Sequence, residues 1–141
     1  CIRDSIRTML GFNYTNLAII RPGVDVFDPR VIRASMGALF NINFEYFNSF
    51  DEYLTKYPER EVYPLMLKGA KNIHQITAAN NKHSLVFGNE SSGLPDDYLK
   101  YGQSVFIPHS DKIDSLNLSM ALGITLCHFS MMEFKDKQVL R

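Results

Sequence analysis

The chain has 141 residues, of which 45% are hydrophobic and 21% are charged. These values predict one globular domain over residues 1–141 with a single core, and they exclude a disordered chain. Basic and acidic residues number 15 each, so the net charge by itself gives no information about a nucleic-acid partner. No apolar run is long enough to cross a membrane, and no signal peptide is visible; we therefore expect a cytoplasmic protein with reduced cysteines.

Helices and strands are predicted to alternate along the whole chain. The first half is predicted to contain a helix over residues 4–12, a strand over 17–20, a helix from Asp28 to about Asn41, a strand over 44–47 and a helix over 49–57. The second half is predicted to contain a strand over 62–67, a helix over 72–79, a strand over 84–87, a helical turn over 95–101, a strand over 105–107 and a helix over 115–134. This order indicates a mostly parallel sheet with helices on both faces. A strand before Asp4 would complete the alternation, and we expect it to have been lost from the start of this chain.

The last predicted helix is apolar on nearly all sides. One stripe along it consists of Leu116, Met120, Ile124, Cys127 and Met131. Such a helix is buried on several sides, either in a core or against a second subunit. Ser115 and Asn117 both fall at its start, where unpaired backbone N–H groups gather. Capping explains Ser115 most naturally, which leaves Asn117 as a candidate site residue.

Parallel sheets bind ligands beyond the carboxyl ends of their strands. Three predicted strand ends lead into loops that contain glycine or proline: residues 65–69, 87–95 and 106–108. The second loop is the most unusual, because Gly88 and Gly93 allow close backbone approach and Glu90 is the one carboxylate between them. Glu90 also has a simpler explanation, as an acidic residue that favours the start of the helical turn after Pro95.

Arginines are concentrated near the start of the chain. Those that precede the first lysine, Lys56, are Arg3, Arg7, Arg21, Arg30 and Arg33. The guanidinium group is a planar fork that suits phosphate, whereas the lysine ammonium is a point charge. A solvated surface with chance clustering is the alternative, and Arg7 in particular has the option of a weak surface ion pair with Asp4.

Several common site motifs are absent from the sequence. There is no phosphate-binding P-loop, no dinucleotide-binding glycine motif and no serine nucleophile elbow, since Ser91 has Gly93 after it but Asn89 before it. The histidines and cysteines lack the spacing of metal ligands, so we predict no metal site.

Two segments together resemble a known family. Residues 87–94 (FGNESSGL) and residues 105–108 (VFIP) followed by 115–119 (SLNLS) are similar to the second and third motifs of the SpoU-type (TrmH-like) RNA ribose 2′-O-methyltransferases of the SPOUT superfamily. Residues 31–40 (VIRASMGALF) also resemble a segment common in that family. The likeness covers essentially the whole chain.

The resemblance implies an α/β domain with a C-terminal trefoil knot, which is a rare exception to unknotted topology. It implies S-adenosylmethionine as the cofactor, a structured tRNA or rRNA as the substrate, and a homodimer that buries the knot and the last helix. The implied cofactor-contacting residues are Leu65, Gly88, Ile107 and Leu116. The implied catalytic residues are Arg7, Glu90, Ser115 and Asn117, with Arg7 acting across the dimer interface.

The first family motif is altered in this chain. The family motif has an asparagine where this chain has Cys1, and a small residue where this chain has Arg3.

Methyl transfer to a ribose 2′-hydroxyl needs alignment of the acceptor and stabilisation of developing negative charge. Because the arginine pKa exceeds about 12, we predict that Arg7 is an electrostatic stabiliser and not a base. The alternative is an RNA-binding protein that has kept the knot and lost catalysis.

Overall fold

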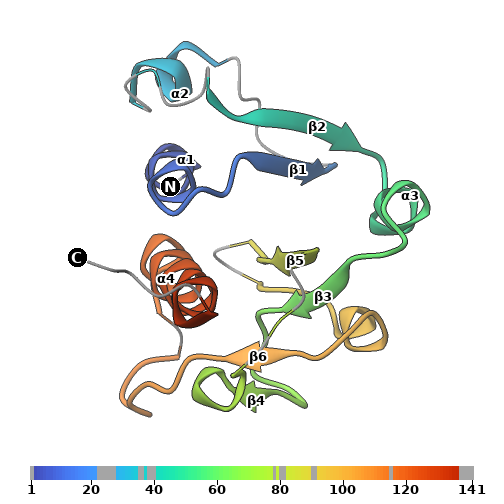
Figure 1. Ribbon diagram of the computed structural model, residues 1–141, viewed down its shortest axis with the longest axis vertical. Helices are drawn as coiled ribbons and strands as arrows, with labels where there is room; N and C mark the ends of the chain where they lie inside the picture. The colour runs from blue at the N-terminus through green and yellow to red at the C-terminus, as the bar shows by residue number, and fades with distance from the viewer. Residues whose placement is uncertain are drawn as a thin grey trace. The chain divides into compact units, whose positions relative to one another are not determined.

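The computed structural model describes residues 2–21, 28–34, 37, 41–77, 79, 82–89, 92–114 and 116–136. The chain divides into two compact units, Cys1–Pro58 and Glu59–Arg141, and each contains parallel strands together with helices (Figure 1). The predicted α/β class with parallel strands is therefore confirmed. Within the described residues, no helix combines the length and the apolar character needed to span a membrane.

The first unit is built on one parallel strand pair. Strand β1 (Asn16–Ile20) runs beside β2 (Asn43–Phe47), with Ile20 opposite Phe47. Among the described residues, the α-helices of this unit are α1 (Ile2–Gly11), α2 (Pro29–Ala34) and α3 (Phe50–Lys56). Helix α3 packs on β2 through aromatic rings, and the ring centroids of Phe47 and Tyr53 lie 5.3 Å apart. These two rings are buried and form part of the core of the unit.

Short-range polar contacts set the ends of these helices. The Asp28 carboxylate accepts the backbone N–H of Arg30 at 2.8 Å, which begins α2 as predicted. The Ser49 hydroxyl accepts the N–H of Glu52 at 3.1 Å and caps α3. Asn13 follows α1 with a φ of 61°, a left-handed conformation that ends the helix. Gly37 has a φ of 84°, so the predicted continuous helix from Asp28 to about Asn41 is wrong at that residue.

The second unit contains two parallel strand pairs, β5–β3 and β6–β4, which lie side by side (Figure 1). These strands are β3 (Glu61–Pro64), β4 (Lys71–Asn72), β5 (His83–Val86) and β6 (Val105–Phe106). A bridge between Leu65 and Val105 joins the β5–β3 pair to the β6–β4 pair. The remaining elements of this unit are the 3₁₀ helices η2 (Ile73–Gln75) and η3 (Asp96–Lys100) and the long helix α4 (Leu118–Asp136).

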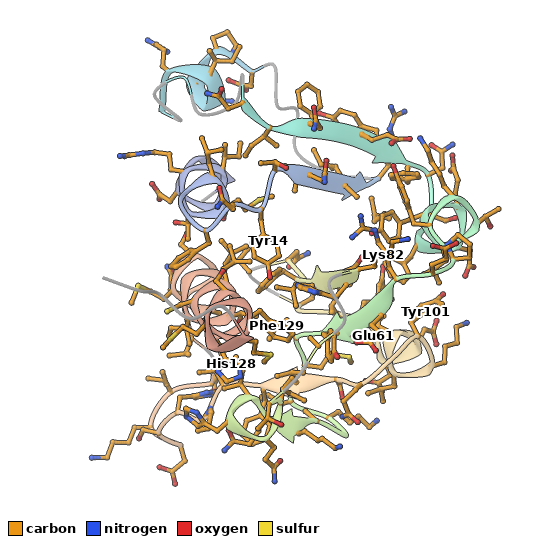
Figure 2. The ribbon with its side chains drawn as sticks, viewed as in Figure 1. Tyr14, Glu61, Lys82, Tyr101, His128 and Phe129 are labelled. Carbon is orange, nitrogen blue, oxygen red and sulfur yellow. The ribbon has the colours of Figure 1, made fainter. Side chains whose placement is uncertain are left out.

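Helix α4 packs on this sheet through one face. Phe129 is 2% exposed, and its ring lies 5.1 Å from that of Tyr63 on β3 and 5.3 Å from that of His83 on β5 (Figure 2). The neighbouring His128 ring bonds the Ile76 carbonyl at 2.7 Å and so links α4 to the segment after η2. A carbonyl only accepts hydrogen bonds, so the Nε2 of His128 carries the proton.

The helix predicted over residues 72–79 is wrong. Lys71 and Asn72 instead form strand β4, and only residues 73–75 are helical, as a 3₁₀ turn. The Asn72 side-chain oxygen accepts the N–H of His74 at 2.9 Å, and the Gln75 side-chain oxygen accepts the N–H of Asn72 at 3.1 Å. These two bonds form a capping box that closes the turn. Ile73 and Ile76 are both buried, and their spacing of three residues fits a 3₁₀ turn as well as an α-helix.

Candidate cofactor and active site

Three strand ends of the second unit lie at one edge of its sheet. Leu65 follows β3, and its N–H donates to the Val86 carbonyl of β5 at 2.9 Å while the residue itself bridges to Val105 of β6. Gly88 lies two residues beyond the end of β5, and Ile107 follows β6 directly. All three strands are parallel, so the structure brings Leu65, Gly88 and Ile107 to the edge where the sequence predicts a ligand site.

The loop after β5 closes tightly on itself. The Gly93 N–H donates to the Asn89 carbonyl at 3.0 Å, and the Ser92 N–H donates to the Asn89 side-chain oxygen at 2.9 Å. Gly93 has a φ of 66°, and a Cβ added at Gly88 would lie 2.3 Å from the carbonyl carbon of Gly93. Gly88 is therefore required by close backbone approach within the loop. Glu90 belongs to the same loop, and the prediction for its side chain lies outside the described residues.

The segments that follow β3 and β6 are held by polar contacts that sequence reasoning missed. The Lys68 ammonium donates to the Asp96 carboxylate at 2.8 Å, and the Ser104 hydroxyl donates to the Lys68 carbonyl at 3.2 Å. The hydrogen bond to Asp96 raises the pKa of Lys68. The Nδ1–H of His109 donates to the Ile107 carbonyl at 2.8 Å. The sequence contained one signal for this bond, because a histidine two residues after Ile107 is near enough for its ring to bond the Ile107 carbonyl.

Asn117 caps the long helix. Its side-chain oxygen accepts the N–H groups of Ser119 at 2.9 Å and Met120 at 3.4 Å, and its carbonyl accepts the N–H of Ala121. Since α4 begins at Leu118, the prediction that Ser115 caps this helix is wrong. The prediction of a catalytic Ser115 lies outside the described residues. Leu116, which immediately precedes the cap, is half-buried.

Arg7 lies in the first unit, on the exposed side of α1. Ser5, Ile6 and Met9 form the buried side of this helix. Arg7 borders an open hollow of about 310 Å³, whose lining also includes Asp4 and Thr8. None of the ion pairs within the described residues involves Arg7, so the guanidinium group remains available for an anionic ligand.

The sheet edge fits an adenosine-type cofactor chemically. Leu65, Ile107 and Leu116 are half-buried apolar side chains, which suit the faces of a purine ring. The loop closed by Gly93 brings backbone groups to the same edge. Within the described residues, no three histidine, cysteine or acidic side chains gather in a metal-binding group.

These features define a class of protein, namely an α/β fold with a candidate ligand site at the carboxyl edge of parallel strands. The family model described as the SpoU rRNA Methylase family matches residues 4–127. A candidate tRNA (cytidine(34)-2′-O)-methyltransferase from Listeria innocua is 34% identical over 123 residues, which cover 84% of this chain and 72% of that protein.

Two solved structures have similar folds. The structure of a candidate RNA methyltransferase from Bacillus anthracis has a TM-score of 0.82 and 26% identity, and the match covers 99% of this chain and 91% of that one. An AdoMet-bound rRNA methyltransferase from Sinorhizobium meliloti has a TM-score of 0.81 and 27% identity, and the match covers 89% of this chain and 49% of that one. This chain therefore spans about half the length of the Sinorhizobium protein.

The chain belongs to the SpoU rRNA methylase family. The predicted resemblance and the predicted class, S-adenosylmethionine-dependent RNA ribose 2′-O-methyltransferase, are thereby confirmed. The individual site residues, the knot and the dimer remain predictions.

Proposed function

We propose that this chain methylates the ribose 2′-hydroxyl of cytidine 34 in tRNA. The observation that carries the proposal is the convergence of the three strand ends at Leu65, Gly88 and Ile107 in a chain of this family. The choice of tRNA rests on the name of the Listeria relative, of which this chain covers 72%. A ribosomal RNA is the second candidate, because a relative from Streptomyces laurentii with 27% identity is named for adenosine 1067 of 23S rRNA. We propose that this activity takes place in the cytoplasm.

S-adenosylmethionine supplies an electrophilic methyl group on a sulfonium. Leu65, Ile107 and Leu116 would hold its adenine, with the loop from Gly88 beside them. Asn117 lies at the start of α4, where its side-chain oxygen accepts the N–H groups of Ser119 and Met120. Its NH₂ group is proposed to donate a hydrogen bond to the acceptor ribose. Glu90 and Ser115 are proposed to position the same ribose.

Arg7 is proposed to stabilise negative charge on the 2′-oxygen as that oxygen loses its proton and takes up the methyl group. The guanidinium group remains protonated throughout, so its contribution is electrostatic. The guanidinium group also has further N–H donors that can bond a neighbouring phosphate. We propose that Arg7 of one protomer serves the sheet edge of its partner, as the family resemblance implies.

A homodimer and a C-terminal trefoil knot belong to the same proposal. Support for the dimer comes from α4, where Met120, Ile124 and Met131 are 62%, 40% and 56% exposed. These side chains belong to the apolar stripe that the sequence predicts to meet a core or a second subunit. An exposed apolar stripe at helical spacing is typical of a surface that another chain covers.

The test is single-turnover methyl transfer to a tRNA transcript with cytidine 34, beside the same RNA with 2′-deoxycytidine at that position. We expect transfer to the first RNA only. Arg7→Ala is expected to slow transfer by about a hundredfold or more while leaving cofactor affinity unchanged. Arg7→Lys is expected to rescue the rate poorly, because a point charge replaces the fork. Arg30→Ala is the matched control, since Arg30 is already paired with Asp28.

Transfer to a 23S rRNA fragment in place of the tRNA would move the substrate to ribosomal RNA. Cofactor binding without transfer to either RNA would favour the alternative of an RNA-binding protein that has lost catalysis. A near-native rate in Arg7→Ala would remove Arg7 from the active site.

A further inference from the structure

Arg21 is held at the carboxyl end of the β1–β2 pair in the first unit. Its backbone N–H donates to the Phe47 carbonyl at 2.8 Å. Its guanidinium carbon lies 5.2 Å from the centre of the Tyr46 ring, which is a cation–π contact. Arg21 is nevertheless exposed to solvent. Backbone and side chain are thus both oriented while the group stays open to a ligand.

Side-chain hydrogen bonds distinguish Arg30 and Arg33 of the same unit from Arg21. Arg30 directs its fork at Asp28, with Nε at 3.2 Å and Nη2 at 2.9 Å from the two carboxylate oxygens. Arg33 donates from Nε to the Pro29 carbonyl at 3.4 Å. Arg21 takes part in none of the ion pairs formed within the described residues. Its charge and its hydrogen-bond donors therefore remain for a ligand.

The other cations that lie over aromatic rings do not offer the same surface. Lys56 lies 5.6 Å from the Tyr57 ring centre and is paired with Glu45. Lys100 lies 5.1 Å from the Tyr101 ring centre, and its ammonium group has no planar face. The guanidinium group of Arg21, in contrast, is flat and cationic. Unpaired RNA bases stack on such planes, and the fork donates to a base edge or a phosphate.

We propose that Arg21, supported by Tyr46, stacks on an unpaired base of the substrate RNA. The inference rests on the proposed function, because it supposes an RNA substrate, and it adds a specific binding contact in the first unit. The carboxyl edge of parallel strands is also where such folds place ligands. Arg21 is a substrate-binding residue in this proposal and takes no part in the chemical step.

The test measures the affinity for a fluorescent anticodon stem–loop RNA by anisotropy at several salt concentrations. Stacking contributes about 1–3 kcal/mol per base, so Arg21→Ala is expected to raise the Kd by about 5-fold to 150-fold. Arg21→Lys is expected to restore the salt dependence but only part of the affinity. Lys100→Ala and Arg30→Ala, which each remove one exposed cation, are expected to change the Kd little. In single-turnover assays at saturating RNA, Arg21→Ala should keep the wild-type rate.

A fully paired RNA duplex of the same length separates stacking from charge. It offers phosphates but no unpaired base, so we expect Arg21→Ala and wild type to bind it alike. An equal loss on duplex and stem–loop would overturn the stacking contact, as would an unchanged stem–loop Kd with a lowered thermal unfolding midpoint. Failure of the wild-type chain to bind or methylate any RNA would instead refute the proposed function.

Discussion

Replacing Gly88 with alanine tests whether the loop after β5 forms part of the cofactor site. A Cβ at this position would lie 2.3 Å from the carbonyl carbon of Gly93 and 2.5 Å from the nitrogen of Leu94. Both are backbone atoms, so the side chain is accommodated only if the loop itself shifts. Such overpacking costs about 1–3 kcal/mol. If the displaced loop contacts the cofactor, affinity for S-adenosylmethionine should fall by about 5-fold to 150-fold.

Two further glycines provide controls for this experiment. A Cβ at Gly102 would lie 2.0 Å from the carbonyl oxygen of Val62, so Gly102→Ala is equally crowded, but it lies before β6 and away from the carboxyl edge. This variant should lose stability and keep the cofactor affinity of its folded fraction. A Cβ at Gly11 meets nothing within 4 Å, so Gly11→Ala should change neither property appreciably.

Isothermal titration calorimetry gives the affinity, and urea unfolding gives the stability of each variant. Unchanged affinity in Gly88→Ala would refute the placement of the cofactor beside this loop. An equal loss of affinity in Gly102→Ala would show that the effect comes from general destabilisation. The family resemblance implies that Gly88 contacts the cofactor, and the structure adds that a Cβ at this position would meet the backbone of Gly93.

Two other predictions concern pH and assembly. Burial, with help from the Glu61 carboxylate, raises the pKa of Tyr63 from 10.0 to about 12, so the folded chain keeps this phenol protonated where unfolded tyrosine ionises. The protonated phenol therefore contributes fully to the free energy of unfolding below pH 10, and this contribution should be lost as the pH rises toward 12. Urea unfolding over this pH range should show a smaller loss of unfolding free energy in Tyr63→Phe than in wild type. Met120→Lys places a charge in the exposed stripe of α4 and should convert the proposed dimer into monomers, which sedimentation equilibrium detects; a monomeric wild-type chain at micromolar concentration would contradict the dimer.

Elements with strong local signals were predictable from the sequence. The strand predicted over residues 44–47 is observed at Asn43–Phe47, and the helix predicted over 49–57 is observed at Phe50–Lys56 with Ser49 as its cap. Alternating apolar runs and capping side chains act within a few residues, so they are readable without the fold. The three strand ends of the ligand edge were predictable for the same reason.

Elements that depend on distant pairing were not predictable. Strand β4 has only two residues, and it exists because Lys71 and Asn72 pair with Val105 and Phe106, more than thirty positions along the chain. The same pairing helps to replace the predicted helix over residues 72–79 by a short turn. The start of α4 was mispredicted for another reason. Serine and asparagine are both favoured capping residues, the sequence favoured Ser115, and only the hydrogen bonds identify Asn117 as the cap.

Asn117 therefore has two roles to separate, helix cap and proposed active-site donor. Its oxygen holds the N–H groups of Ser119 and Met120, which leaves its NH₂ group as the donor that methyl transfer would use. Asn117→Ala removes both roles and should cost about 1 kcal/mol of stability. Asn117→Asp and Asn117→Ser retain a capping oxygen and lose the NH₂ group.

If Asn117 is only a cap, the aspartate and serine variants should match wild type in both thermal unfolding and single-turnover rate. If its NH₂ group contacts the acceptor ribose, these variants should unfold like wild type yet transfer the methyl group at least tenfold more slowly. A tenfold loss of rate corresponds to about 1.4 kcal/mol of activation free energy, which is what one hydrogen bond in the transition state contributes. The aspartate variant should be the slower of the two, because its carboxylate lies where negative charge develops on the 2′-oxygen. Wild-type rates in both variants would leave capping as the whole function of Asn117.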